Sequence, residues 1–163
     1  MKLDITEQML FALLRSALHG THADATIFAG ITSEAWQECY RLSVRQGVMA
    51  LAWDGLITLP TELQPPKSLK INWWLAVERC EKRYRYYCRV ISDLSTFYAT
   101  HGITAVQLKG VGFANNYPIP SHREGGDIDI FTYSADSSGL SDREANSLAD
   151  KLMSCLLYTS DAA

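Results

Sequence analysis

A periodic run of apolar residues between about residues 67 and 100 constrains the fold of this chain more than any other feature of its sequence. The apolar positions recur every three or four residues, at Ile71, Trp74, Val77, Cys80, Tyr84, Tyr87, Ile91, Leu94 and Tyr98. Because an α-helix has about 3.6 residues per turn, this spacing places them along one side of a single long helix. We therefore expect the stripe to face a core.

Shorter helices are predicted before the long one. Their expected bounds are residues 6–19, 32 or 33 to 47, and 48–59. The first ends at Gly20, which suits a left-handed C-cap, and the third is closed by Pro60. The proline-containing segment 61–66 is the expected linker to the long helix. Residues 1–100 are thus predicted to form a helical N-terminal region.

The composition is that of a globular chain without disordered bias. Apolar residues make up 47% of the sequence and charged residues 20%, and the net charge is -3. No apolar run approaches the roughly 18 residues that a membrane helix needs, and the first residues do not form a signal-peptide core. The four cysteines show neither a Cys-x-x-Cys pair nor a zinc-like spacing with histidine. We expect a cytoplasmic protein with reduced thiols and no membrane association.

Two carboxylates alternate with apolar residues in segment 126–131, Gly-Asp-Ile-Asp-Ile-Phe. We expect this segment to be a short strand. Because successive strand side chains point to opposite faces, Asp127 and Asp129 would project to one side while the isoleucines anchor the other. Mg²⁺, or Mn²⁺ in its place, takes one or two protein carboxylates and completes its shell with water and substrate phosphate. The pair therefore predicts a metal site, and the alternative is a solvated pair at a strand end.

The residues before this pair form a second pattern. Residues 106–110, which end in Leu-Lys-Gly, are expected to be a buried strand that runs into a glycine turn. A short helical stretch at 113–117 follows, and Pro118 and Pro120 stop it. Segment 123–127, Arg-Glu-Gly-Gly-Asp, then leads into the carboxylates. A strand, a turn and a helix are thus expected just before the acidic pair.

In order and spacing, these residues resemble the nucleotidyltransferase superfamily that includes DNA polymerase beta, and more narrowly its largely uncharacterised bacterial branch. The pattern of that branch is L-K-G, then Y-x-x-P, then R-x-x-G-D-I-D-L, behind a helical N-terminal region. This chain carries counterparts at residues 108–110, 117–120 and 123–130. The resemblance implies an α+β protein in which the helical region, 1–100, precedes a partial nucleotidyltransferase palm, 101–154. In such a palm, helices flank a mixed sheet.

The resemblance also implies an activity, the transfer of a nucleoside monophosphate from an NTP to an acceptor hydroxyl. Asp127 and Asp129 would be the catalytic residues and would bind Mg²⁺ or Mn²⁺. Lys109, Gly110 and Arg123 would bind the substrate. The NTP is the expected partner, and the acceptor is left open.

The turn departs from the pattern of better-studied members, in which a serine follows the glycine. Here Val111 follows Gly110, so backbone amides and a cation, Lys109 or Arg123, would have to hold the phosphates. Each cation also has a structural alternative. Lys109 could be an exposed strand-end lysine, and Arg123 could pair with Asp127 or Glu124.

The superfamily places a third carboxylate on a later strand, and no nearby acid matches it. Asp136 lies in an expected loop, and Asp142 and Glu144 lie at the expected start of a last helix. Residues 155–163 resemble a translated sequencing-adapter tail, which we expect not to be native. On this interpretation the third carboxylate lies beyond the chain, and the fragment is inactive by itself. The other interpretation is that Leu156 and Leu157 continue the preceding helix.

The long helix carries an excess of lysine and arginine, which could contact nucleic acid. We do not favour that interpretation, because the chain is acidic overall and a charged run on a helix is usually its solvated face. The four histidines are expected to be caps or surface residues without a catalytic role. A second hypothesis for the whole chain is a non-catalytic binding module built on a degenerate palm.

Overall fold

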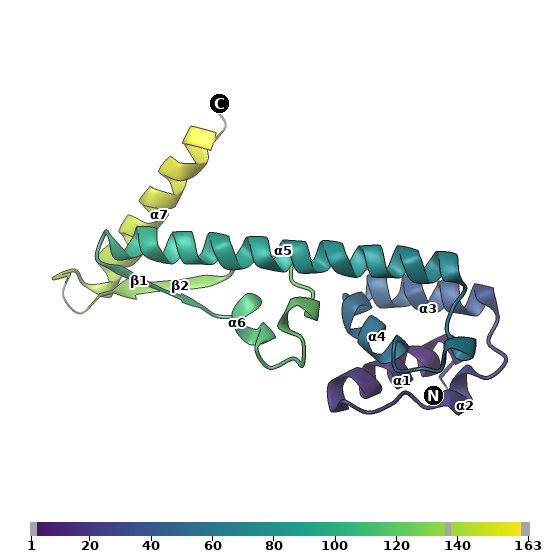
Figure 1. The fold of residues 1–163 in the computed structure, drawn as a ribbon. Coiled ribbons are helices and arrows are strands. Elements are labelled where there is room, and N and C mark those ends of the chain that lie inside the picture. The colour runs from purple at the N-terminus through teal and green to yellow at the C-terminus, as the bar shows by residue number, and fades with distance from the viewer. Residues whose placement is uncertain (1–2, 136–137, 161–163) are drawn as a thin grey trace. The chain divides into compact units, whose positions relative to one another are not determined.

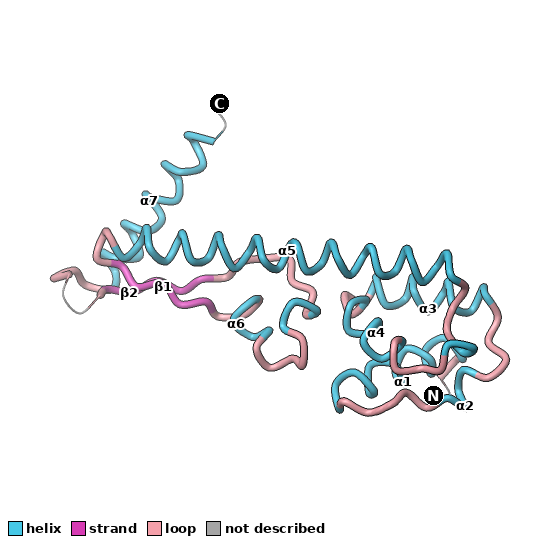
Figure 2. Tube along the Cα trace, viewed as in Figure 1, coloured by secondary structure: helices cyan, strands magenta, loops and turns pink. Residues whose placement is uncertain are grey.

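The structure is a computed structural model that describes residues 3–135 and 138–160, with side chains as far as residue 154. Its helices and strands are shown in Figure 1, and Figure 2 colours them by type. In chain order they are α1 (Ile5–His19), α2 (Ala25–Phe28), α3 (Ser33–Arg45), α4 (Met49–Leu56), the short 3-10 helix η1 (Thr61–Leu63), α5 (Lys67–Ala99), β1 (Ile103–Gln107), α6 (Val111–Ala114), the 3-10 helix η2 (Pro120–His122), β2 (Ile130–Ser134) and α7 (Asp142–Ser160).

Local capping signals account for the ends of several helices. Asp4 caps α1 and forms a reciprocal capping box with Glu7, and Gly20 closes that helix in a left-handed conformation with φ of 63°. Thr32 caps α3 by accepting a hydrogen bond from the backbone N–H of Ala35. The long helix α5 runs from Lys67 to Ala99. The predicted helical N-terminal region is confirmed.

The described chain forms two compact units, and α5 contributes to both. The first contains the described part of residues 1–85 together with 114–126. Its core lies among α1, α3, α4 and the first half of α5. Trp73 is fully buried there, its indole N–H donates to the carbonyl oxygen of Met49 at 2.9 Å, and its ring contacts Tyr40. A large aromatic side chain with a satisfied N–H therefore joins α5 to α4.

The predicted core stripe of α5 is wrong at its N-terminal end. Ile71 and Trp74 are 46% and 47% exposed, whereas Trp73 is buried. The buried positions in this half of the helix are 73, 76, 77 and 80, which keep the i, i+3, i+4, i+7 spacing of a helix face. The predicted Val77 and Cys80 are buried, so the difference is confined to the first turns, where the indole of Trp73 finds a hydrogen-bond partner on α4.

The second unit contains residues 86–113 and the described part of 127–163. Strands β1 and β2 pair antiparallel, with Ile103 opposite Ser134 and Gln107 opposite Ile130. Helix α7 packs against β2, and the described hydrophobic core of this unit consists of Tyr98, Ile103, Ala145 and Ala149. A small sheet flanked by helices, behind a helical region, is the predicted α+β class.

The strand bearing the acidic pair begins later than predicted. Asp127 and Asp129 precede β2, which starts at Ile130. The reason is that the partner strand stops at Gln107: the last backbone bond runs from the N–H of Leu108 to the carbonyl oxygen of Asp129 at 3.0 Å. Strand β1 is also only partly buried, because helices cover one side of this sheet; the other side leaves Val106 41%, Leu108 64% and Phe131 50% exposed.

Helix α7 begins with the predicted capping box. The Ser141 hydroxyl and the Glu144 carboxylate exchange hydrogen bonds with each other's backbone N–H groups. The helix continues to Ser160, so the backbone of the predicted tail 155–163 starts inside it; the side chains from residue 155 and all of 161–163 lie outside the described residues. Asp136 lies outside them too. None of the described helices is long and apolar enough to cross a membrane.

Candidate functional site

Lys109 and Asp129 form an ion pair in the second unit. The ammonium nitrogen of Lys109 lies 3.2 Å from Oδ2 of Asp129. The backbone bond from Leu108 to Asp129 places the two residues next to each other across the end of the sheet. Because both side chains are partly or largely exposed, such a pair stabilises a fold by only about 0–1 kcal/mol. A metal cation could therefore replace Lys109 beside Asp129 at little energetic cost. A phosphate could equally attract the ammonium group of Lys109 away from Asp129.

Gly110 forms the turn beside this pair, and only glycine fits it. Its φ of 72° is left-handed, and an ideal Cβ here would lie 3.1 Å from both the carbonyl oxygen of Asp127 and Nε2 of Gln107. The glycine thus allows the backbone at Asp127 to approach the end of β1. Lys109, Gly110, Asp127 and Asp129 thus lie in one unit, and their role as a site stays a prediction.

Gln107 was not singled out by the sequence, yet its side-chain amide is unusual. Among the described residues, its Nε2 is a buried side-chain nitrogen without a hydrogen-bond partner. A buried donor left unpaired costs roughly 1–3 kcal/mol, so such groups are uncommon. They often mark a site at which an ion or a water molecule supplies the missing partner. Its neighbour is the Gly110 turn, where the backbone of Asp127 also lies.

Arg123 belongs to the first unit, in segment 120–126, which leads along the chain to Asp127. Its guanidinium lies over Gly125, with Nη1 3.5 Å from the position of an ideal Cβ there. The segment is held on α4 and α5 by the residues on either side of Arg123. Those residues are His122 and Glu124.

His122 is buried and lies between two carboxylates, so its prediction as a cap or surface residue is wrong. Its Nδ1 lies 2.8 Å from Oδ1 of Asp54 on α4, and its Nε2 lies 3.0 Å from Oε1 of Glu81 on α5. Burial alone would lower the pKa of His122, but the hydrogen bonds and charges of the two carboxylates outweigh burial and raise it. The hydrogen bond from His122 in turn lowers the pKa of Glu81. No local pattern predicts this triad, because its members are far apart in the sequence.

Glu124 caps a helix from a distance. Its Oε1 accepts hydrogen bonds from the backbone N–H groups of Met49, at 2.7 Å, and Ala50, at 3.4 Å. These are the first amides of α4, whose own N-cap residue Val48 makes no side-chain cap bond. A carboxylate there is also favoured by the positive end of the helix dipole.

One comparison with known proteins identifies the family. A family model described as an uncharacterised nucleotidyltransferase matches residues 32–140, more than half of the chain. The chain belongs to this nucleotidyltransferase family. No curated protein and no solved structure matches it significantly. The matched region of the chain includes the acidic pair, the Lys109–Gly110 turn and the His122 triad.

The donor chemistry of the acidic pair fits a magnesium ion shared with a nucleotide. Two carboxylates and no more are what Mg²⁺ commonly takes from a protein in phosphate-transfer sites. Among the described residues, no group of three or more His, Cys, Asp or Glu side chains is placed to hold a metal ion. Asp142 and Glu144 serve as capping acceptors for the backbone N–H groups of Ser134 and Ser141. A site at Asp127 and Asp129 would therefore need ligands from water and substrate phosphate.

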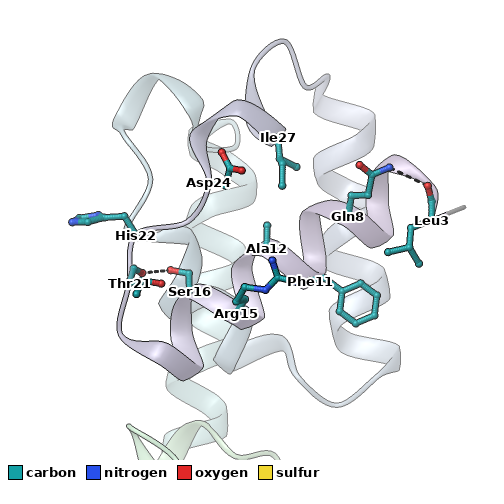
Figure 3. Close-up of a pocket in the computed structure, with 10 residues that line it drawn as sticks. All are labelled: Leu3, Gln8, Phe11, Ala12, Arg15, Ser16, Thr21, His22, Asp24 and Ile27. Carbon is teal, nitrogen blue, oxygen red and sulfur yellow. Dashed lines mark hydrogen bonds between the residues drawn. The ribbon is translucent and has the colours of Figure 1, made fainter.

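The chain also has a hollow of about 250 Å³ beside α1 and α2 (Figure 3). Its lining residues come from α1 and segments 3 and 21–27, outside the matched region. Figure 3 shows two of the polar groups already engaged, since Gln8 donates to the Leu3 carbonyl oxygen and Ser16 to that of Thr21. Asp24 likewise caps α2 through Thr26. None of the predicted site residues lines this hollow.

Proposed function

We propose that this chain carries the nucleotide- and metal-binding part of a nucleotidyltransferase that uses an NTP and Mg²⁺. The observation that carries the proposal is the grouping of Asp127, Asp129, Lys109 and Gly110 in one unit of a chain that belongs to a nucleotidyltransferase family. Carboxylates, a cation and a tight glycine turn are groups that suit the binding of a metal–triphosphate.

In the proposed reaction, an acceptor hydroxyl oxygen forms a bond to the α-phosphorus of the NTP. The bond from that phosphorus to the bridging oxygen of the β-phosphate breaks, pyrophosphate leaves, and the hydroxyl proton passes to solvent or a base. When bound, Mg²⁺ supplies charge neutralisation and polarisation of the phosphoryl oxygens.

The residues of the chain contribute binding and orientation. Asp127 and Asp129 would supply the carboxylate oxygens that hold the metal. Lys109, freed from Asp129 when the metal takes that carboxylate, would turn its ammonium group to phosphate oxygens. The Gly110 turn lets backbone approach the phosphates without a side chain in the way. Arg123 lies in the other unit and stays a substrate-binding residue by sequence prediction alone.

A thermal-shift experiment tests the metal and nucleotide assignment. Mg²⁺ or Mn²⁺ with ATP, at millimolar concentration, should raise the melting temperature of the chain by mass action. The double variant Asp127→Asn with Asp129→Asn should lose this shift. Asp93→Asn, an exposed acid on α5 in the same unit, is the matched control and should keep it. A shift of full size in the double variant would contradict the metal assignment.

The competing function is a non-catalytic binding module. It is favoured by the lack of a third acid beside the pair among the described residues and by the engagement of Asp129 with Lys109. Incubation with an NTP labelled at its α-phosphate separates the two functions. Transfer of label that is lost in Asp127→Ala supports the enzyme, whereas nucleotide binding without transfer supports the module.

A further inference from the structure

Segment 120–126 is docked on α4 and α5 by three side-chain contacts within the first unit. His122 bonds to Asp54 and Glu81, and Glu124 bonds to the first amides of α4. The thiol of Cys80 donates to the carbonyl oxygen of Ser121 at 3.5 Å. Arg123, one of the proposed substrate-binding residues, lies between two of these anchors.

Both ring nitrogens of His122 face carboxylate oxygens, which can only accept hydrogen bonds when ionised. A neutral imidazole has one N–H, so it can satisfy one carboxylate but presents a lone pair to the other. Only the imidazolium donates to both. Since the His122 side chain is 6% exposed, water has little access to replace a lost contact. The geometry thus requires the charged ring.

We propose that His122 is a positioning residue whose imidazolium docks segment 120–126 on α4 and α5, and that loss of its proton releases the segment. Release would separate one carboxylate from the ring and would also weaken the hydrogen bonds between Glu124 and the first amides of α4. Any effect on nucleotide binding, through greater mobility of Arg123, rests on the proposed function. The docking of segment 120–126 on α4 and α5, here called the dock, does not.

The charged and titratable groups around His122 come from every element packed against it. Helix α4 contributes Asp54, and the segment itself contributes Glu124. Helix α5 contributes Glu81, which also forms an ion pair with Arg85 at 3.4 Å. It also contributes Cys80, whose sulfur has a side-chain hydrogen bond with Arg83. Burial raises the pKa of the Cys80 thiol, so it stays protonated and donates to Ser121. The groups in direct contact with the ring are both acids, and they favour its charge.

The signs of the pKa shifts define the pH window of the dock. The pKa of His122 is raised, so its contribution is fully present below the ordinary histidine value of 6.5 and is lost as pH rises through the higher value in the folded chain. The pKa of Glu81 is lowered, so its contribution is present above 4.5 and is lost as pH falls through the folded value. The docking of segment 120–126 is therefore strongest between these limits, and the segment is released as pH rises above the pKa of His122 in the folded chain.

Nuclear magnetic resonance of the nitrogen-labelled chain, without nucleotide, tests the dock. The His122 ring, assigned by comparison with His122→Gln, should keep both N–H groups and titrate above the ordinary histidine value. Protection of the Arg123 and Met49 amides against hydrogen exchange, corrected for intrinsic rates, should fall through the same midpoint. An ordinary midpoint, or protection that does not follow the titration, would overturn the proposal.

A second variant keeps the test decisive if His122→Gln fails to fold. Glu81→Gln removes one partner charge at the more exposed end of the triad and should lower the His122 midpoint by about one pH unit. The exchange transition should move with it. Glu78→Gln, one turn earlier on α5, should move neither. A Glu81→Gln midpoint equal to that of the wild type would contradict the role of the triad.

The effect on nucleotide binding is measured in a separate experiment. The affinity for Mg²⁺-ATP in thermal shift should weaken in the wild type above the His122 midpoint and weaken at lower pH in Glu81→Gln. Absence of any Mg²⁺-ATP shift at every pH would overturn the proposed function alone, because the ring titration and exchange are measured without nucleotide.

Discussion

Gly55 lies where α4 packs closely against the backbone of α1. An ideal Cβ at this position would lie 2.1 Å from the carbonyl oxygen of Leu13 and 2.7 Å from its Cα, so the obstacle is backbone. Its backbone is not left-handed, which separates it from the turn glycines such as Gly110. The requirement for glycine here comes from helix packing, and at Gly110 it comes from both conformation and close approach.

We predict that Gly55→Ala destabilises the chain by at least about 1–3 kcal/mol, because two packed helices must move apart to admit one methyl group. The free energy of unfolding in urea measures this. Gly126→Ala, where an added Cβ has no neighbour within 4 Å, is the control and should change the stability little. Equal stability of Gly55→Ala and the wild type would show that α1 and α4 do not pack as described.

At the scale of elements, α4 depends on a residue far away in the sequence for its start. Several helices begin at a local cap, as α1 does at Asp4 and α3 at Thr32. Helix α4 instead receives its cap from Glu124, and its buried residues pack in the core of the first unit. The helix and segment 120–126 therefore stabilise each other.

Glu124→Ala should cost about 0.5–2 kcal/mol, the usual loss for a helix cap, and should speed hydrogen exchange at Met49. Glu124→Gln should cost less, because the amide oxygen still accepts and only the charge at the helix dipole is lost. Glu62→Gln, an exposed acid in η1, serves as the control. Unchanged exchange at Met49 in Glu124→Ala would rule out the cap.

At the scale of the whole molecule, the second unit has an apolar surface that no described residue covers. Val106 and Phe131 are opposite each other in the strand register, Phe131 stacks on Tyr133, and Leu108 continues the surface beyond the strand. With two strands described, each also has an unpaired edge. Exposed apolar sheet surface and free strand edges both promote association.

We therefore expect the 163-residue chain to self-associate or to be poorly soluble as concentration rises. Leu108→Lys together with Phe131→Lys should raise the monomer fraction in sedimentation velocity. Phe11→Lys, which changes a similarly exposed aromatic residue on α1, should have a smaller effect because it touches no sheet edge. A wild type that stays a sharply melting monomer at high concentration would contradict this expectation.

Much of the helical fold could be predicted because its signals act over a few residues. The Gly20 C-cap, the Thr32 N-cap and the Ser141–Glu144 capping box lie within one turn of the helices they end or begin. Periodicity predicted the length of α5 but not which neighbouring tryptophan is buried. Trp73 rather than Trp74 is buried because its indole N–H donates to the Met49 carbonyl oxygen, a partner on another helix. In the same way, β2 starts at Ile130 because β1 stops at Gln107.

For the candidate site, the sequence alone determined the acidic pair and the Lys-Gly turn, because each is a short pattern whose spacing carries the chemistry. The tertiary structure alone decided that Lys109 pairs with Asp129, that His122 lies between Asp54 and Glu81, and that Glu124 caps α4. Strand alternation and helix capping act between residues close in the chain, so they can be read locally. Ion pairs between distant residues depend on how the helices pack, and burial then decides whether a histidine such as His122 is an ordinary surface group or a charged anchor.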